Sequence, residues 1–331
     1  MITESSKSGG RRSFSAARLF QLLAPFLGLV LVLLLFSTLE PGNFANLRNF
    51  RTIATQTVIV GLGAIGMTYV IISAGIDLSV GSLIAMSSVV VACSLKSGVP
   101  PLLAALLGVA TGALLGAVNG VVIATLRILP FIVTLGMLGV ARGLAKYIAG
   151  EQKVDAPASW LPELMVKNPE PRWLLVAPGI WLTVLLALAM SAVLRRTRFG
   201  LHAIAIGSSE ATAYLCGIRV ERVKIAIYAL CGAFAGLAGV LQFCRLTVGD
   251  PTTGIGEELN IIAAVVIGGG SLAGGEASIL GAMIGAFLMA ALSNGCGISG
   301  VPNYVQEILI GVIIVVAVAI DQLRHRRRAF G

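Results

Sequence analysis

The stretch GIDLSVGS, at residues 75–82, holds the polar side chains of this chain that are best placed to do chemistry. Asp77, Ser79 and Ser82 stand among glycines, directly after a continuous apolar run. One interpretation is structural: these residues cap the N-terminus of the helix that follows. The other is functional: the stretch is a polar break between two membrane-spanning segments and lines a water-filled path. The choice between the two depends on the segments that surround the stretch.

Nothing else in the sequence points to a bond-making enzyme. The glycine-rich stretch GGGSLAGGEAS, at 268–278, lacks the lysine that a phosphate-binding loop requires. The chain has only two histidines, His202 and His325, which leaves almost no material for triads or histidine metal sites. Its five cysteines show no CxxC spacing. We therefore expect no catalytic residue, no metal and no cofactor in this chain.

The composition indicates a membrane protein. Hydrophobic residues make up 57% of the 331 positions and charged residues 12%, whereas a soluble domain carries roughly a quarter charged residues. The apolar runs are continuous rather than alternating, so they predict helices and not the strands of a transmembrane barrel. The fold class is therefore all-α and polytopic. The net charge of +9 comes without the interleaved aromatic residues of a nucleic-acid site, so the expected partner is the lipid bilayer and not nucleic acid.

Ten apolar runs predict membrane-spanning helices, at 19–37, 53–73, 80–95, 102–125, 130–149, 174–194, 224–244, 259–273, 278–295 and 304–320. The run at 259–273 is short and ends in glycines, so we expect some helices to be broken or re-entrant. With the N-terminus placed inside, most of the 24 Lys and Arg residues fall on the cytoplasmic side. The positive-inside rule therefore predicts that both termini are cytoplasmic.

This topology divides the chain into a cytoplasmic tail at 1–18, a single transmembrane domain at 19–321 and a basic cytoplasmic tail at 322–331. Two loops are long: 150–173 lies outside and mixes both charge signs, and 195–223 lies inside and is strongly basic.

The inner loop contains the sequence SSEATAYLCG, which predicts a short helix capped by Ser208 or Ser209 and ended by Gly217. A short helix held across a cytoplasmic face is typical of an element that docks a soluble partner.

Polar residues inside the membrane-spanning runs are candidates for a substrate path, although packing between helices would also explain each one. The path set that we expect is Asp77, Ser79, Ser82, Asn119, Thr134, Ser271 and Asn294, and Gln242 and Asn260 are further neutral hydrogen-bonding groups. Such groups suit an uncharged, polyhydroxylated solute. Arg142 also falls within a run, and it either snorkels outward beside Lys146 or pairs with Glu307.

Four long segments occur in an order that identifies a family: GIDLSVGSLIAM, GAVNGVVIATLRILPFIVTLGMLGVARGLA, FGLHAIAIGSSEATAYLCGI and AAVVIGGGSLAGGEASILGAMIGAFLMAALSNG. They resemble the ribose/galactose/arabinose-type permeases of bacterial ATP-binding cassette (ABC) sugar importers, within the superfamily of branched-chain amino-acid and monosaccharide permeases. The resemblance covers about 50–321.

The resemblance implies a homodimeric, multi-pass pore subunit in the bacterial inner membrane, with loop 150–173 in the periplasm. It implies two further partners: a cytoplasmic ABC ATPase with two cassettes, which holds the ATP and magnesium, and a periplasmic sugar-binding protein. It also makes the segment around Ser209, Glu210, Ala211 and Gly217 the coupling helix seated in that ATPase. On this basis the chain translocates a monosaccharide and is not itself an enzyme.

The chain departs from the family pattern in the coupling segment, where GSSEATAYLCGI stands in place of text similar to GGNEEAARLSGI. The contact with the ATPase therefore differs in detail. Two alternatives stay open: a branched-chain amino-acid permease of the same fold, and a carrier or channel that works without an ATPase.

Overall fold

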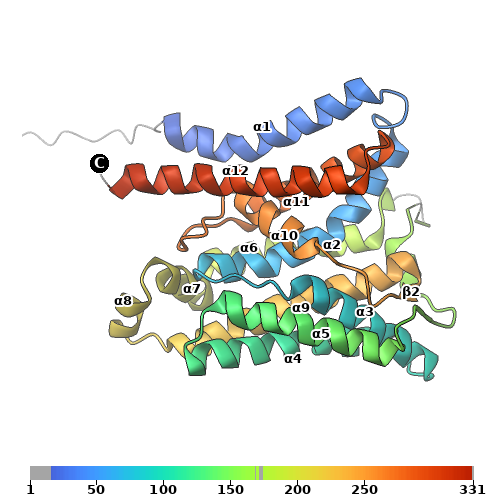
Figure 1. Cartoon of the computed structure of the whole chain (residues 1–331), viewed down its shortest axis with the longest axis horizontal. Coiled ribbons are helices and arrows are strands. Elements are labelled where there is room, and N and C mark those ends of the chain that lie inside the picture. The colour runs from blue at the N-terminus through green and yellow to red at the C-terminus, as the bar shows by residue number, and fades with distance from the viewer. Residues whose placement is uncertain (1–15, 168, 171–173, 330–331) are drawn as a thin grey trace, which may run out of the picture.

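The computed structural model describes residues 16–167, 169–170 and 174–329, which form a bundle of helices with one two-stranded sheet (Figure 1). The helices are α1 (Ala16–Leu39), α2 (Leu47–Ile72), α3 (Val80–Lys96), α4 (Pro101–Leu126), α5 (Pro130–Ala149), α6 (Pro178–Arg196), α7 (Arg198–Ser208), α8 (Glu210–Leu215), α9 (Val220–Leu246), α10 (Glu257–Ile267), α11 (Ile279–Ile298) and α12 (Asn303–Ala329). The strands are β1 (Val154–Asp155) and β2 (Val248–Gly249), and a 3₁₀ helix spans Leu161–Met165. Most of the expected tail at 1–18 and the last two residues of the tail at 322–331 lie outside the described residues.

Each of the ten predicted apolar runs overlaps one of these helices. By length and composition, seven helices in the described part of the chain can cross a membrane: α2, α4, α5, α6, α9, α11 and the portion of α12 at Asn303–Leu323. Helix α3 and the described apolar part of α1 are shorter. The prediction of an all-α polytopic membrane protein is thereby confirmed.

The glycine-rich stretch at 268–278 explains why α10 is short. Helix α10 ends at Ile267, so the predicted run at 259–273 is not one continuous helix. Gly274 and Gly275 then adopt φ angles of +87° and +78°, which residues with a Cβ rarely adopt. The N–H of Gly275 donates to the carbonyl oxygen of Ile72 at 2.9 Å, which ties this loop to the end of α2. These glycines therefore form the turn between α10 and α11.

Helices α4 and α9 pack closely because glycines face each other along both of them (Figure 1). A Cβ at Gly112 would overlap the carbonyl oxygen of Gly232 and lie 2.7 Å from the Cα of Gly236. Only residues without side chains permit this backbone contact. Helix α2 lies at the centre of the bundle, and 94% of its most apolar window is buried.

The two long loops lie at opposite ends of the bundle (Figure 1). Helices α7 and α8, within the loop at 195–223, lie at the end where the described part of α1 begins and α12 finishes. Strand β1, within the loop at 150–173, lies at the other end and pairs antiparallel with β2. We call these the α8 end and the β-sheet end. The two long charged loops thus lie at opposite ends, and the long helices run between them.

The α4–α9 contact predicts a sharp difference between two glycines. Gly112→Val places a branched side chain against the α9 backbone, and overpacking of this kind costs about 1–3 kcal/mol. We expect a lower thermal midpoint and a lower yield of monodisperse protein in detergent. Gly136→Val on α5 is the matched control, because no atom lies within 4 Å of a Cβ at that position. Equal losses in both variants would contradict the packing argument.

Candidate functional site

The short helix predicted within the inner loop is present as α8. The hydroxyl oxygen of Ser209 accepts a hydrogen bond from the N–H of Thr212 at 3.2 Å and caps the helix. Gly217, with a φ of +79°, reverses the chain after it. The prediction that Ser209 caps this helix and that Gly217 ends it is confirmed. A second helix, α7, precedes α8 in this loop and was not expected from the sequence.

A cavity of about 660 Å³ lies between α8, the start of α9 and the turn from α4 to α5. Its walls include Arg127, Leu129, Ala211, Tyr214 and Lys224. Tyr214 and Leu215 are 66% and 85% exposed, which is unusual for large apolar side chains outside a membrane face. Helix α8 thus presents exposed apolar side chains beside this cavity.

Glu210 forms an ion pair with another residue of this chain. Its carboxylate oxygen accepts a hydrogen bond from the ammonium of Lys224, on α9, at 2.7 Å. The ion pair fixes α8 against the start of α9 while Glu210 itself stays 59% exposed. Glu210 therefore positions α8, and the exposed small residue Ala211 lies next to it.

The stretch at residues 75–82 contributes to a cluster of buried polar side chains. One carboxylate oxygen of Asp77, Oδ1, accepts hydrogen bonds from the N–H of Ser79 at 2.8 Å and from its hydroxyl at 2.6 Å. Asn119, on α4, donates to the Ser79 hydroxyl oxygen at 3.0 Å. All three side chains are fully buried. Ser79 occupies the N-cap position of α3 but makes no side-chain hydrogen bond to that helix, so the expected capping by its hydroxyl is wrong.

Thr134 joins this cluster from α5, where its hydroxyl lies 3.4 Å from the carbonyl oxygen of Ile76. Ser82, also fully buried, follows one turn later on α3. Several buried polar atoms of this region have no hydrogen-bond partner among the described residues: Asp77 Oδ2, Asn119 Oδ1, Ser82 Oγ and Tyr228 Oη. Four of the seven predicted path residues, Asp77, Ser79, Asn119 and Thr134, thus come together at one place.

The other two predicted path residues lie elsewhere. The hydroxyl of Ser271 donates to a carboxylate oxygen of Asp321, on α12, at 3.0 Å. Asn294 lies on α11, and its buried Oδ1 has no partner in the described part of the chain. A path role for any of the seven residues stays a prediction.

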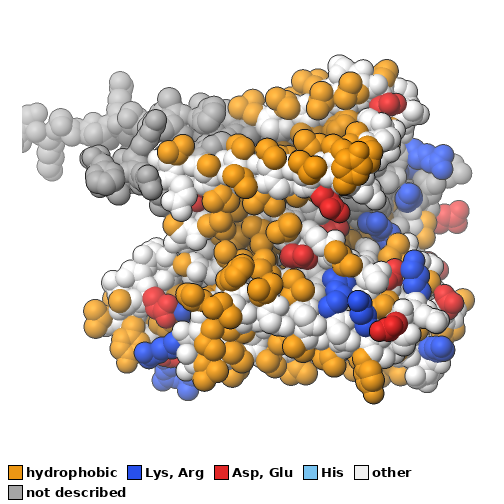
Figure 2. Space-filling view, viewed as in Figure 1, with side chains coloured by type: hydrophobic (Ala, Val, Ile, Leu, Met, Phe, Trp, Pro, Cys, Tyr) orange, Lys and Arg blue, Asp and Glu red, His pale blue; other side chains and the backbone are white. Residues whose placement is uncertain are grey.

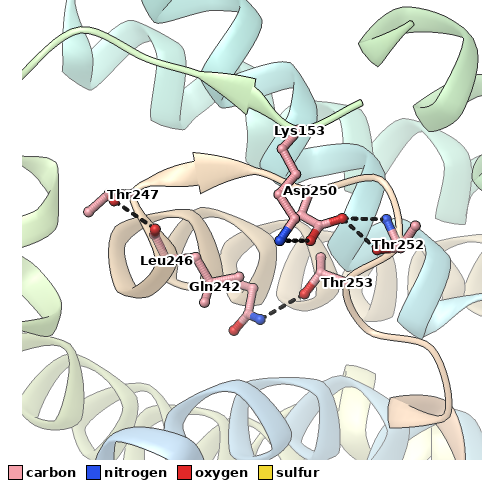
Figure 3. Close-up of polar contacts among 7 residues, drawn as sticks. All are labelled: Lys153, Gln242, Leu246, Thr247, Asp250, Thr252 and Thr253. Atoms are coloured by element: carbon pink, nitrogen blue, oxygen red, sulfur yellow. Dashed lines mark hydrogen bonds and ion pairs between the residues drawn. The ribbon is translucent and has the colours of Figure 1, made fainter. Parts of the chain in front are cut away.

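The loop after β2 is fixed from several sides (Figure 3). Asp250 accepts hydrogen bonds from the N–H and hydroxyl of Thr252 at 2.8 and 2.6 Å, and pairs with Lys153 at 3.4 Å. Burial alone would raise the pKa of the Asp250 carboxyl, but the Thr252 hydrogen bonds and the Lys153 ammonium hold this pKa below its ordinary value. The ion pair links the outer loop at 150–173 to the loop that follows α9.

Arg142 binds the same loop. Its guanidinium donates to the carbonyl oxygens of Pro251 and Thr253 at 2.8 and 2.6 Å. Arg142 thus bonds to loop carbonyls in place of Glu307, the partner that the sequence suggested, because it reaches a loop more than a hundred residues away in the chain. A charged residue within an apolar run is thus satisfied by backbone carbonyls at the β-sheet end.

A bundle of membrane-length helices with buried polar groups inside and an exposed short helix at one end is the architecture of the membrane-spanning part of a transport system. Comparison with known proteins agrees. Residues 49–318 match the family model described as branched-chain amino acid transport system / permease component. The chain belongs to this permease family.

Individual relatives are similar over nearly their full length. The chain is 39% identical over 316 residues to the ribose import permease protein of Escherichia coli (strain K12), which covers 96% of this chain and 98% of the relative. It is 40% identical over 304 residues to the ribose import permease protein of Bacillus subtilis (strain 168), covering 91% and 93%. It is 38% identical over 306 residues to the fructose import permease protein of Rhizobium meliloti, covering 90% and 84%. No solved structure matches the chain.

The buried cluster predicts different outcomes for two substitutions of Asp77. Asp77→Asn keeps an oxygen that accepts from Ser79, so we expect nearly normal folded yield. Asp77→Leu leaves the N–H and hydroxyl of Ser79 buried without that acceptor, at about 1–3 kcal/mol for each group. We expect a lower thermal midpoint in detergent for the Leu variant. Lost transport by the Asn variant at unchanged yield would instead assign the carboxylate a role in the path.

Proposed function

We propose that this chain is the membrane-spanning, pore-forming subunit of an ATP-driven importer that translocates a monosaccharide delivered by a periplasmic binding protein. One observation carries the proposal: relatives that cover most of the chain at 31 to 40% identity are named as permeases for ribose, fructose, L-arabinose and D-allose. These substrates share an uncharged, polyhydroxylated chemistry.

The family description also names branched-chain amino acids, so an amino-acid permease is the second candidate. The names of the relatives favour the sugar. ATP hydrolysis is assigned to a partner ATPase, since the sequence lacks a nucleotide-binding motif.

We call α8 and the cavity beside it the inner docking surface, and its exposed apolar side chains support a site for that ATPase. Helix α8 is short, exposed and joined to α9 through the Glu210–Lys224 ion pair. A movement of a partner seated on α8 would therefore be passed to α9, which packs against α2, α3 and α4. We propose that Ser209, Glu210, Ala211 and Gly217 form the coupling element, in which Ala211 permits close docking and the other residues hold the helix.

The arrangement of the ends supports an even number of membrane crossings with both termini in the cytoplasm, and the proposed ten crossings count α3 and the short α10 among them. An even number of crossings returns the chain to its starting side, and α1 begins at the end where α12 finishes (Figure 1). The basic residues of the loop at 195–223 lie at this same end, as the positive-inside rule requires of a cytoplasmic face. Loop 150–173 then faces the periplasm of the inner membrane. A homodimer is proposed from membership of the family alone.

This orientation predicts which cysteines an impermeant thiol reagent reaches in intact spheroplasts. Ala158→Cys, at an exposed position of the outer loop, should be labelled. The native Cys216, exposed after α8, is the internal control and should be labelled only after the membrane is permeabilised. Labelling of Cys216 with protection of residue 158 would invert the topology.

The coupling element predicts a specific loss in the assembled importer. Ala211→Arg adds bulk and an unpaired charge at the docking surface, and burying such a charge costs several kcal/mol. We expect the variant to fold and insert, yet to lose substrate-stimulated ATP hydrolysis in the reconstituted complex. Ala211→Ser, which stays small and uncharged, should keep it. Full stimulation of hydrolysis by the Arg variant would show that α8 is not where the ATPase docks.

A further inference from the structure

A second polar cavity, of about 100 Å³, lies in the half of the bundle toward the β-sheet end. It is separate from the inner docking surface and from the cluster around Asp77. Four helices contribute its polar walls: Gln56 from α2, Gln242 and Arg245 from α9, Glu257 and Asn260 from α10, and Ser293 from α11. Its apolar walls include Ile59 and Met289. We call it the outer polar cavity.

The two charges in this cavity compensate each other. Arg245 and Glu257 lie close enough to attract, and Asn260 donates a hydrogen bond to the Glu257 carboxylate at 3.2 Å. The cavity therefore carries no net charge and presents hydrogen-bonding atoms of both kinds. A neutral ligand with many hydroxyl groups matches this balance better than an ion of either sign does.

Two acceptors in the cavity lack a partner. Gln56 Oε1 and Gln242 Oε1 are buried and have no hydrogen-bond partner among the described residues. The amide nitrogen of Gln242 donates to the hydroxyl of Thr253 at 2.7 Å, which fixes its amide plane and leaves its oxygen pointing away from Thr253 (Figure 3). Buried acceptors without donors are destabilising, so these two oxygens would be stabilised by a donor from a bound ligand.

The cavity is reached from the surface. Arg245 is exposed, while Gln56, Gln242 and Glu257 are half-buried behind it. Figure 2 shows acidic and basic side chains gathered where this face is hollowed, between the part of the molecule formed by α12 and the part formed by α5. Because Arg245 is exposed, a ligand can reach the cavity from the surface without passing through the buried core.

We propose that the outer polar cavity is a subsite for a monosaccharide during its translocation, an inference that rests on the proposed function. Neighbouring ring hydroxyls each donate and accept, so they pair with the amide oxygens of Gln56 and Gln242 and with the carboxylate and guanidinium of Glu257 and Arg245. The volume equals that of about three water molecules. It admits one hydroxyl-bearing edge of a sugar ring, while Ile59 and Met289 contact the C–H surface.

The test uses the complete importer, with its ATPase and binding protein, in proteoliposomes. Uptake is measured for a panel of ribose, fructose, arabinose and allose, with leucine as the amino-acid probe. The variant is Gln56→Leu, with Gln56→Ala as a smaller second change. Thr57→Val is the matched control on the same helix, because the Thr57 hydroxyl bonds only to the carbonyl of Ile53 in its own helix.

We expect Gln56→Leu to lower uptake of the preferred sugar roughly ten-fold, the effect of one lost hydrogen bond in a translocation step. ATP hydrolysis stimulated by the loaded binding protein should persist, because the docking faces are unchanged. The thermal midpoint should stay equal or rise, because an unpartnered buried acceptor is removed. Thr57→Val should transport normally.

The possible outcomes distinguish a failure of the proposed subsite from a failure of the proposed function. Normal sugar uptake by both Gln56 variants would overturn the subsite and leave the proposed function intact. A lower thermal midpoint with a matching loss of both uptake and hydrolysis would also overturn it, since Gln56 would then be structural. A wild-type importer that takes up leucine and none of the sugars would overturn the proposed function and the sugar subsite together.

Discussion

Within a lipid bilayer no water is available to satisfy polar groups, so this chain must satisfy them itself or reserve them for a ligand. The helices satisfy the hydrogen bonds of their own backbones, and the buried polar side chains need partners elsewhere in the structure. Asp77 binds the backbone and hydroxyl of Ser79, and Arg142 binds two loop carbonyls. The few buried atoms that lack partners stand out against this background, and two of them face the outer polar cavity.

Helix α9 connects the two ends of the bundle. Glycines let α4 and α9 approach closely, so that α9 forms a rigid link through the bundle. At one end α9 is joined to α8 by the Glu210–Lys224 ion pair, and near the other end it supplies Gln242 and Arg245 to the cavity. In the function proposed here, a movement of α8 and a sugar bound in the outer polar cavity would therefore be connected through α9.

The sequence predicts the helices well because a continuous apolar run of membrane length has few other solutions. It also locates α8, since a serine cap and a glycine stop are local signals that need no tertiary contact. It misses the end of α10 at Ile267, because the glycine turn after it is defined by its bond to the distant Ile72.

The sequence does not show which polar residues come together in space. Ser271 and Asn294 look equivalent to Asn119 as polar residues within apolar runs, yet only Asn119 reaches the Asp77 cluster. The sequence does not single out Gln56, Arg245 and Glu257, since each lies on a different helix. They share a cavity only because α2 packs beside α9 and α10, which lie far from it in the sequence.

The central claim is ATP-driven uptake of a monosaccharide through this chain. The most direct measurement reconstitutes the chain with its ATPase in proteoliposomes and follows accumulation of the four labelled sugars and of leucine, with the binding protein supplied on the side of loop 150–173. The account predicts that at least one sugar accumulates above its external concentration only when ATPase, ATP and binding protein are all present. Accumulation of leucine alone, or uptake by the chain without the ATPase, would contradict it.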